Sequence, residues 1–129
     1  MSRSGYVDDL DPWPTIMWRG QVASAIRGRR GQAFLRELIA ALDALPEKKL
    51  ISNALEDNGA FCALGAVGHA RGIDLSEVDT HDHDQMVSVF GIADQMIREI
   101  EYLNDEAFYV SPEERWVAMR KWAAANLKP

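Results

Sequence analysis

The sequence predicts a mostly α-helical protein, a compact bundle of about five helices with one small two-stranded β-hairpin. Two observations support this fold class. Apolar residues recur at three- and four-residue spacing along much of the chain, as they do on the buried side of helices. The pair Asn58-Gly59 stands between two short apolar runs, and Asn-Gly is the strongest short-range signal for a β-hairpin. A chain of 129 residues, 47% of them apolar, is long enough for one domain with a buried core.

The N-terminal region is expected to divide into an arm and the start of the fold. Residues 1–14 are predicted to be loosely ordered, because the aspartates and prolines of "DDLDPWP" favour neither helix nor strand. Residues 15–129 are then predicted to form a single helical domain. Its first helix is expected over residues 15–26, directly after Pro14.

The clearest helix signal covers residues 32–45. Gly28 and Gly31 of "RGRRG" interrupt the preceding pattern, and Pro46 ends the helix, because the residue before a proline disfavours the helical conformation. The stripe predicted to face the core consists of Leu35, Leu38, Ile39, Leu42 and Leu45.

The hairpin is predicted from two apolar runs, residues 50–55 and 60–64, on either side of "EDNG". Both Asn58 and Gly59 accept the positive φ that a tight hairpin turn needs. Because a ribbon of this size is only marginally stable alone, we expect it to lie on helices.

A short helix of small residues is predicted over residues 63–70. Gly65, Ala66 and Gly68 give it faces with almost no side chain, so that another backbone can approach closely. Gly72 is well placed to end this helix.

The last part of the chain is expected to be helical after a loop over residues 73–84. Apolar residues stay in helical phase over residues 85–103, and Gly91 is predicted to split this stretch into two helices. Ser111-Pro112 followed by two glutamates is a strong start signal for a final helix, since it combines an N-cap, a first-turn proline and acids at the positive end of the helix dipole.

The net charge of −6 is unevenly distributed. Residues 1–60 carry eight basic and eight acidic side chains, whereas residues 61–129 carry six basic and twelve acidic ones. A net-acidic protein is repelled by nucleic acid unless a local basic patch prevails, and it attracts basic surfaces. Ordinary solubility is the alternative explanation of this charge.

A cytoplasmic location is expected from three features. No apolar run has the length needed to span a bilayer, and the N-terminal residues contain no apolar signal core. The single cysteine, Cys62, cannot form an internal disulfide.

Cys62 and His69 suggest a nucleophile and its base, but their spacing argues against it. Seven residues on one helix correspond to two turns, about 10.5 Å, whereas such a pair must lie within about 3 Å. We therefore predict that Cys62 is a buried core residue. The glycines of "GAVGHARG" match neither the Walker pattern nor the dinucleotide fingerprint.

The run "THDHD" contains His81, Asp82, His83 and Asp84, all residue types that bind metals. Zinc and iron sites need three or four converging ligands, and this spacing matches no established ligand pattern. The run is better explained as the start of a helix, with Thr80 or Asp82 as its cap. We predict no metal ligands and no cofactor.

The stretch "MVSVFGIADQMIREI" resembles a helix-turn-helix in its apolar skeleton and turn glycine. A recognition helix must face phosphates and bases, but the second helix here carries Asp94, Glu99 and Glu101. Such a surface repels DNA, so its charge argues against nucleic-acid binding through this segment.

The only basic patch consists of Arg27, Arg29 and Arg30. Arginines in this arrangement bind an anion, a nucleic acid or an acidic partner. The alternative is a solvated connector whose arginines pair with acids of the same protein.

Five segments together resemble an uncharacterised family of small proteins encoded by bacteriophages and proteobacterial prophages. They are "IRGRRGQAFLRELIAALDALPEKKLI", "FCALGAVGHARGID", "FGIA", "EIEYLNDE" and "SPEERWVAMRKW", and they cover about residues 18–123. "CALGA" and "ND" are also similar, more weakly, to another small domain family of unknown function. The resemblance implies a phage accessory gene that acts in the infected bacterial cell, and it assigns no catalytic residues.

Since no set of catalytic groups stands out, the sequence favours a non-enzymatic protein-binding module. Its expected partner is a host or phage protein, for instance a bacterial defence component, and no oligomeric state is specified. Contact is predicted through an acidic surface centred on Glu99, Glu101, Asp105 and Glu106; alternatively, Arg98 and Arg115 neutralise these acids within the fold. The alternative function is a nucleic-acid-associated regulator that uses the helix-turn-helix-like segment or the arginine patch.

Overall fold

The computed structural model describes residues 3–5, 12–107 and 111–129, and in these ranges it confirms a mostly α-helical protein with one small hairpin. Its elements are α1 (Pro12–Arg27), α2 (Arg29–Ala44), β1 (Glu56–Asp57), β2 (Ala60–Phe61), α3 (Ala63–Ala70), the 3₁₀ helix η1 (Leu75–Glu77), α4 (His83–Phe90), α5 (Asp94–Tyr102), the π-helix η2 (Leu103–Ala107) and α6 (Pro112–Ala125). None of the helices described is both long and apolar enough to cross a membrane.

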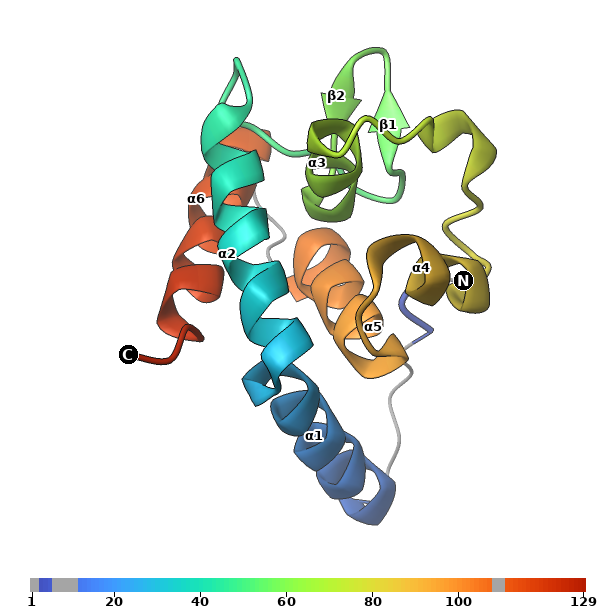
Figure 1. The fold of residues 1–129 in the computed structure, drawn as a ribbon, viewed down its shortest axis with the longest axis vertical. Helices are drawn as coiled ribbons and strands as arrows, with labels where there is room; N and C mark the ends of the chain where they lie inside the picture. Colours follow the sequence, from blue (N-terminus) through green and yellow to red (C-terminus); the bar gives the residue numbers. More distant parts are fainter. Residues whose placement is uncertain (1–2, 6–11, 108–110) are drawn as a thin grey trace.

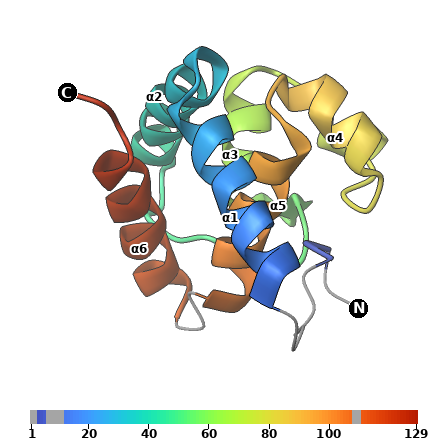
Figure 2. The same cartoon turned by 90° about the horizontal axis from the view of Figure 1, so that it is seen from below.

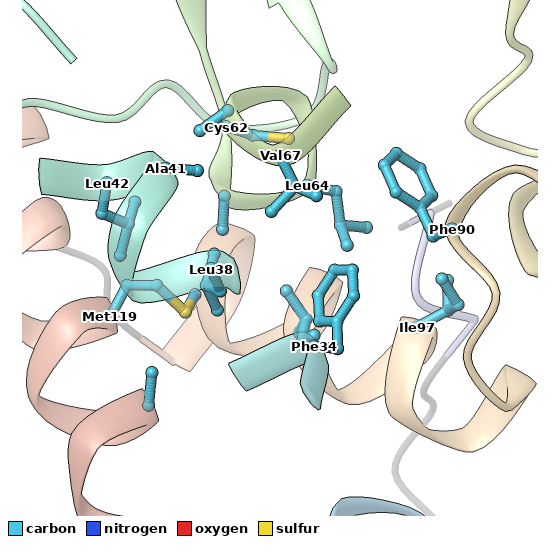
Figure 3. Packing of buried hydrophobic residues seen from close by; sticks show 14 of the residues in the cluster. Phe34, Leu38, Ala41, Leu42, Cys62, Leu64, Val67, Phe90, Ile97 and Met119 are labelled. Atoms are coloured by element: carbon cyan, nitrogen blue, oxygen red, sulfur yellow. The ribbon is translucent and has the colours of Figure 1, made fainter. Parts of the chain in front are cut away.

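Helix α2 organises the core. It packs against α1, α3 and α6, and Figure 1 shows it running between α6 on one side and α3 with α5 on the other. Its leucines at positions 35, 38 and 42 are fully buried, as the apolar stripe predicts. Figure 3 shows Leu38 and Phe34 of α2 meeting Leu64 and Val67 of α3, Ile97 of α5 and Met119 of α6.

Helix α5 lies in the middle of the molecule. Met96, Ile97 and Ile100 are fully buried, and none of the residues from Asp94 to Tyr102 is exposed. Figure 2 shows α1 crossing over α5, with α6 and α4 on opposite sides. Both faces of α5 are therefore covered by protein.

The first two helices begin earlier than the sequence predicts, at Pro12 instead of residue 15 and at Arg29 instead of residue 32. Gly31 does not interrupt α2; it lies inside the helix. A Cβ atom at this position would lie 2.7 Å from the carbonyl oxygen of Ile26 and closer still to that of Ala25. Gly31 is therefore needed for the close approach of α2 to the end of α1.

The hairpin is confirmed, but its strands are only two residues each. Glu56 pairs with Phe61 and Asp57 with Ala60. Asn58 and Gly59 have φ values of 51° and 80°, as the tight turn requires. The residues before β1 do not continue it as a regular strand, because Asn53 has a φ of 64°, outside the extended range. Leu50 and Leu55 of this segment are buried.

Helix α3 has the predicted bounds and packs under the hairpin (Figure 1). Its ends and those of the later helices follow the predicted signals. Gly91 ends α4 in the left-handed conformation at φ 71°, and the Ser111 hydroxyl accepts a hydrogen bond from the Glu114 N–H at 3.2 Å to cap α6. Asp82, one of the two predicted caps, starts α4 by accepting from the Gln85 N–H.

Candidate functional site

The N-terminal residues that the structure describes are not a loose arm. Arg3 and Ser4 are buried, and the Arg3 side chain reaches η2 and the segment before α4. This differs from the expected loosely ordered arm for residues 3–5, and the reason is a buried counter-charge: Arg3 donates two hydrogen bonds to Asp105, at 2.6 and 2.9 Å. Bidentate arginine–carboxylate pairs are among the strongest polar contacts in proteins.

Five side chains form what we call the Arg3 cluster: Arg3, Thr80, His83, Glu101 and Asp105. Arg3 Nη1 donates to Thr80 Oγ1 at 3.1 Å, and Thr80 Oγ1 donates to Glu101 Oε2 at 3.2 Å. Glu101, which is fully buried, lies 4.0 Å from Arg3 and 2.9 Å from His83 Nε2. The cluster thus connects the N-terminal segment, the segment before α4 and the end of α5.

Burial raises the pKa of both carboxylates of the cluster, Glu101 and Asp105, and the neighbouring positive charge lowers it. Burial raises the pKa of Glu101 above its ordinary value of 4.5, against the opposing effects of Arg3, His83 and Thr80. Burial also raises the pKa of Asp105, but the hydrogen bonds and charge of Arg3, with the Asn53 N–H and Asn104, outweigh it and hold this pKa below 3.8. One carboxylate therefore favours its proton while the other favours its charge.

The stability of the protein should depend on pH in two opposite ways. Asp105, with a lowered pKa, stabilises the fold above pH 3.8, and this contribution is lost as the pH falls through its folded-state pKa. Glu101, with a raised pKa, stabilises the fold below pH 4.5, and this contribution is lost as the pH rises through its folded-state pKa. We expect the difference in unfolding free energy between the wild type and Glu101→Gln to shrink as the pH rises above about 4.5, measured by urea unfolding.

Asp105→Asn provides the opposite case. The difference in unfolding free energy between the wild type and Asp105→Asn should grow as the pH rises from 3 towards 5. Only the wild type gains a charged carboxylate that interacts with Arg3 over this range. If the free-energy differences for Glu101→Gln and Asp105→Asn changed in the same direction with pH, a raised pKa for Glu101 and a lowered pKa for Asp105 could not both hold.

Asn104 joins the Arg3 cluster to helix α3. It lies in the π-helix η2, a rare form that displaces side chains from the regular helical positions. Its Oδ1 accepts from the Ala63 N–H at 3.1 Å, and its Nδ2 donates to Ile51 O and Asp105 Oδ1, both at 2.9 Å. The "CALGA" and "ND" segments of the sequence, about 40 residues apart, thus meet in one buried polar site.

Cys62 is fully buried, as predicted, and it is the N-cap of α3. Its Sγ accepts from the Gly65 N–H at 3.3 Å. His69 lies in the last turn of α3, whereas Cys62 precedes its first turn, so the two are about two helical turns apart, as predicted. The His69 ring stacks on Phe61, with ring centroids 4.5 Å apart. A serine at position 62 would find a donor for its hydroxyl in the Gly65 N–H, which the sequence could not show.

The predicted acidic contact surface needs correction. Glu99, Glu101 and Asp105 are buried and engaged within the fold, and only Glu106 is exposed, where it accepts a hydrogen bond from Ser4. Glu99 binds Arg19 of α1 at 2.6 and 2.9 Å. These acids lie on the faces of α5 and η2 that α1 and residues 3–5 cover.

The cations that engage these acids are not the two that the sequence suggested. Arg98 pairs with Asp94 of its own helix, and Arg115 donates to the Leu50 carbonyl oxygen at 2.8 Å. Arg3 and Arg19 take their place, from positions 102 and 80 residues away in the chain. The alternative interpretation, that the acids are part of the fold, is the one that fits the geometry.

The helix-turn-helix interpretation is also corrected. The two helices and the turn glycine exist as α4, α5 and Gly91. However, α5 would be the recognition helix, and it has no exposed residue and is crossed by α1 (Figure 2). A helix in this position cannot enter a DNA groove.

The candidate metal ligands of "THDHD" are separated by the start of α4. His81 is exposed, Asp82 caps the helix, and His83 is held by Glu101. Within residues 3–5, 12–107 and 111–129, no three His, Cys, Asp or Glu side chains come together as a metal site would require.

The predicted arginine patch is on the surface, at the junction of α1 and α2. Arg27, Arg29 and Arg30 are all exposed, and none of them forms an ion pair with an acid among the described residues. Arg29 and Arg30 occupy the first turn of α2, where the helix dipole also favours anions.

No protein family matches this chain, and comparisons with curated proteins and with solved structures find no similar protein. The function therefore has to be inferred from the structure and the charge distribution.

Proposed function

We propose that this protein is a non-enzymatic protein-binding module, encoded by a phage or prophage, that acts in the bacterial cytoplasm on a partner with a basic surface. The resemblance to phage proteins supports the origin, and a bacterial defence component is the partner that such an origin favours. The observation that carries the binding role is the distribution of exposed charge.

Seven exposed acids lie on the hairpin and on the segment from η1 to the start of α4. This acidic face consists of Glu56, Asp57, Asp74, Glu77, Asp79, Asp82 and Asp84. Figure 1 shows the hairpin and this segment on the same upper right side of the molecule. Asp74, Asp79 and Asp82 also cap turns, so local structure explains part of the set but not Glu56, Asp57, Glu77 or Asp84.

Little positive charge opposes this face. Residues 51–97 contain eight acids and a single Lys or Arg, Arg71. Arg71 is itself bound to Glu37 of α2, at 2.6 and 2.7 Å. An acidic field of this kind reaches about 8 Å at physiological salt and steers association with a basic surface.

The test is a charge reversal on the acidic face. Glu56→Lys with Glu77→Lys changes two exposed acids for which no side-chain hydrogen bond or ion pair is seen, so the melting temperature should stay close to that of the wild type. Glu47→Lys with Glu113→Lys makes the same change in net charge elsewhere on the surface. Each immobilised protein is incubated with lysate of infected host cells, and the captured proteins are quantified by mass spectrometry.

For at least one captured protein, we expect the amount bound to be roughly 10-fold lower with the acidic-face variant than with the wild type. The amount bound by the control variant should equal that of the wild type. Equal capture by all three proteins would contradict the proposal. Loss with both variants would show that net charge, and not this face, determines binding.

The arginine patch supports a second candidate, a nucleic-acid-associated regulator. Three exposed arginines at one helix junction are arranged to contact phosphates. If this function holds, labelled duplex DNA or RNA should bind with a steep salt dependence, and Arg29→Glu with Arg30→Glu should abolish binding, whereas the acidic-face variant should not weaken it. Absence of salt-dependent binding by the wild type would remove this candidate.

A further inference from the structure

A surface hollow lies between the hairpin and the segment that carries η1. Its volume is about 340 Å³, and it is lined by residues 53–56 on the hairpin side and by Leu75, Ser76 and Val78–Thr80 on the other. Glu56 and Asp79, two members of the acidic face, are among its lining residues. The hollow therefore opens on the face that should attract a basic partner.

Two residues that line this hollow, Asn53 and Thr80, also form hydrogen bonds with side chains of the Arg3 cluster. The Asn53 N–H donates to Asp105 Oδ1 at 3.0 Å. Thr80 Oγ1 accepts from Arg3 and donates to Glu101. Asn53 and Thr80 therefore contact both the hollow and the groups that surround the Arg3 guanidinium.

The groups that receive the guanidinium are held in place by residues other than Arg3. Asp105 Oδ1 accepts from the Asn53 N–H and from Asn104 Nδ2, which fixes the orientation of its carboxylate. Glu101 is fixed by His83 and Thr80. A receptor whose groups are already oriented loses little entropy on binding and holds its ligand more tightly.

The residue next to Arg3 also contacts this part of the fold. Among residues 3–5, Ser4 adds a hydrogen bond from its hydroxyl to Glu106 at 2.9 Å and accepts one from Arg98 at its carbonyl oxygen at 3.1 Å. The guanidinium makes the bidentate contact that its planar fork matches best, and it faces a second carboxylate at 4.0 Å. An arginine presented from elsewhere could make the same contacts.

We propose that the Arg3 cluster is a guanidinium-binding site that Arg3 fills within the chain and that accepts, in exchange, an arginine side chain of a polypeptide partner entering through the hollow. The origin of that arginine rests on the proposed protein-binding function. The site itself does not, and it is tested on the isolated protein.

The first test removes Arg3 and supplies a small guanidine. Arg3→Ala should unfold at a lower temperature than the wild type, because Asp105 and Glu101 stay buried without their cation. Ethylguanidinium at ten times its dissociation constant should raise the melting temperature of Arg3→Ala by roughly 5 °C. Ethylammonium at the same concentration carries the same charge without the planar fork, so it should have little effect.

A double variant supplies the control. In Arg3→Ala with Asp105→Ala the bidentate acceptor is absent, and ethylguanidinium should no longer raise the melting temperature. Equal effects of ethylguanidinium and ethylammonium on Arg3→Ala would overturn the proposal. So would an Arg3→Ala protein that fails to refold both with and without ethylguanidinium, since a preformed site must bind its ligand.

The second test asks whether a polypeptide can deliver the arginine. The peptide acetyl-Arg-Ser-Gly-amide copies residues 3–5 and presents its arginine on a polypeptide backbone. It should bind Arg3→Ala through its arginine and bind the wild type about 10-fold or more weakly, because Arg3 competes for the site. The lysine analogue should bind neither protein; binding of ethylguanidinium without binding of the peptide would exclude a polypeptide ligand.

The source of the arginine is distinguished by mass measurement. A dimer of the wild type that Arg3→Ala no longer forms would assign the arginine to a second copy of this chain, whereas a monomer leaves a partner protein as the source. If ethylguanidinium rescues Arg3→Ala but the acidic-face variant captures the same proteins as the wild type, the site stands and the proposed function fails. The reverse result would leave the acidic face as a docking surface and overturn the guanidinium site.

Discussion

Replacing Gly65 by alanine is expected to destabilise the protein by about 3 kcal/mol or more. A Cβ atom at this position would lie 2.8 Å from the carbonyl carbon of Leu55 and closer still to its oxygen. Both are backbone atoms of the segment that leads into the hairpin, so no side-chain rotation can relieve the overlap. Overpacking a well-filled core usually costs about 1–3 kcal/mol, and a clash with backbone belongs at the upper end or above.

The intrinsic helix preference acts in the opposite direction and makes the comparison sharper. Alanine is favoured over glycine within a helix by about 1 kcal/mol, so a glycine without neighbours should gain stability when it is replaced. Gly20 in α1 is such a position, because among the described residues a Cβ atom there would meet nothing within 4 Å apart from the adjacent backbone of its own helix. Urea unfolding should therefore show Gly20→Ala at or above the wild-type midpoint and Gly65→Ala far below it, with an unchanged slope. A Gly65→Ala protein within about 0.5 kcal/mol of the wild type would show that α3 and the hairpin can separate without loss.

The role of Gly65 was within reach of the sequence, although its partner was not. Gly65, Ala66 and Gly68 in a short helix predict a face that another backbone approaches, and the structure confirms this. The identity of the approaching backbone depends on how the segment before the hairpin folds back, which is a tertiary contact. Local patterns indicate that space is needed; they do not show what fills it.

The buried acids illustrate the opposite limit. The apolar periodicity over residues 85–103 correctly predicts one buried face for α5. Glu99 and Glu101 fall off that stripe, so a helix covered on one side only would expose them. In the structure α1 and residues 3–5 cover the other side as well, and they bring Arg19 and Arg3 as counter-charges. The apolar periodicity of one helix predicts the face that packs on the core, but it does not show whether other segments also cover the opposite face.

A buried acid could still have been suspected on one ground. The N-terminal arm contains an isolated arginine in "SRSG", and buried carboxylates require a cation or a proton. The sequence offers no measure of how a residue near position 3 reaches one near position 105. The arginine patch, in contrast, could be predicted as a surface feature, because three cations within four residues have no nearby acids in the chain.

Asn104→Ala is expected to cost about 2–4 kcal/mol, the second largest effect of a single substitution. The change removes the acceptor of the Ala63 N–H and the donor to the Ile51 carbonyl, and it leaves both groups without this partner next to the core. Each buried polar group left unsatisfied costs about 1–3 kcal/mol. Asn126→Ala is the matched control: its side chain donates one partly buried hydrogen bond, to the Trp122 carbonyl oxygen, and its loss should cost about 1 kcal/mol.

The same substitution should also weaken the hold on Arg3, because Asn104 Nδ2 is one of the two donors that orient the Asp105 carboxylate. The effects of Asn104→Ala and Arg3→Ala on the unfolding free energy should then not add; the double variant should be less destabilised than the sum by about 0.5–3 kcal/mol. Asn104→Asp keeps an acceptor for the Ala63 N–H but places a second carboxylate beside Asp105, so it should lose most of its stability where both acids are charged and regain part of it at lower pH. Urea unfolding of the wild type, the two single variants and the double variant measures this coupling. If the losses of unfolding free energy were additive, the hydrogen bond of Asn104 to the start of α3 and the Arg3 cluster would be independent.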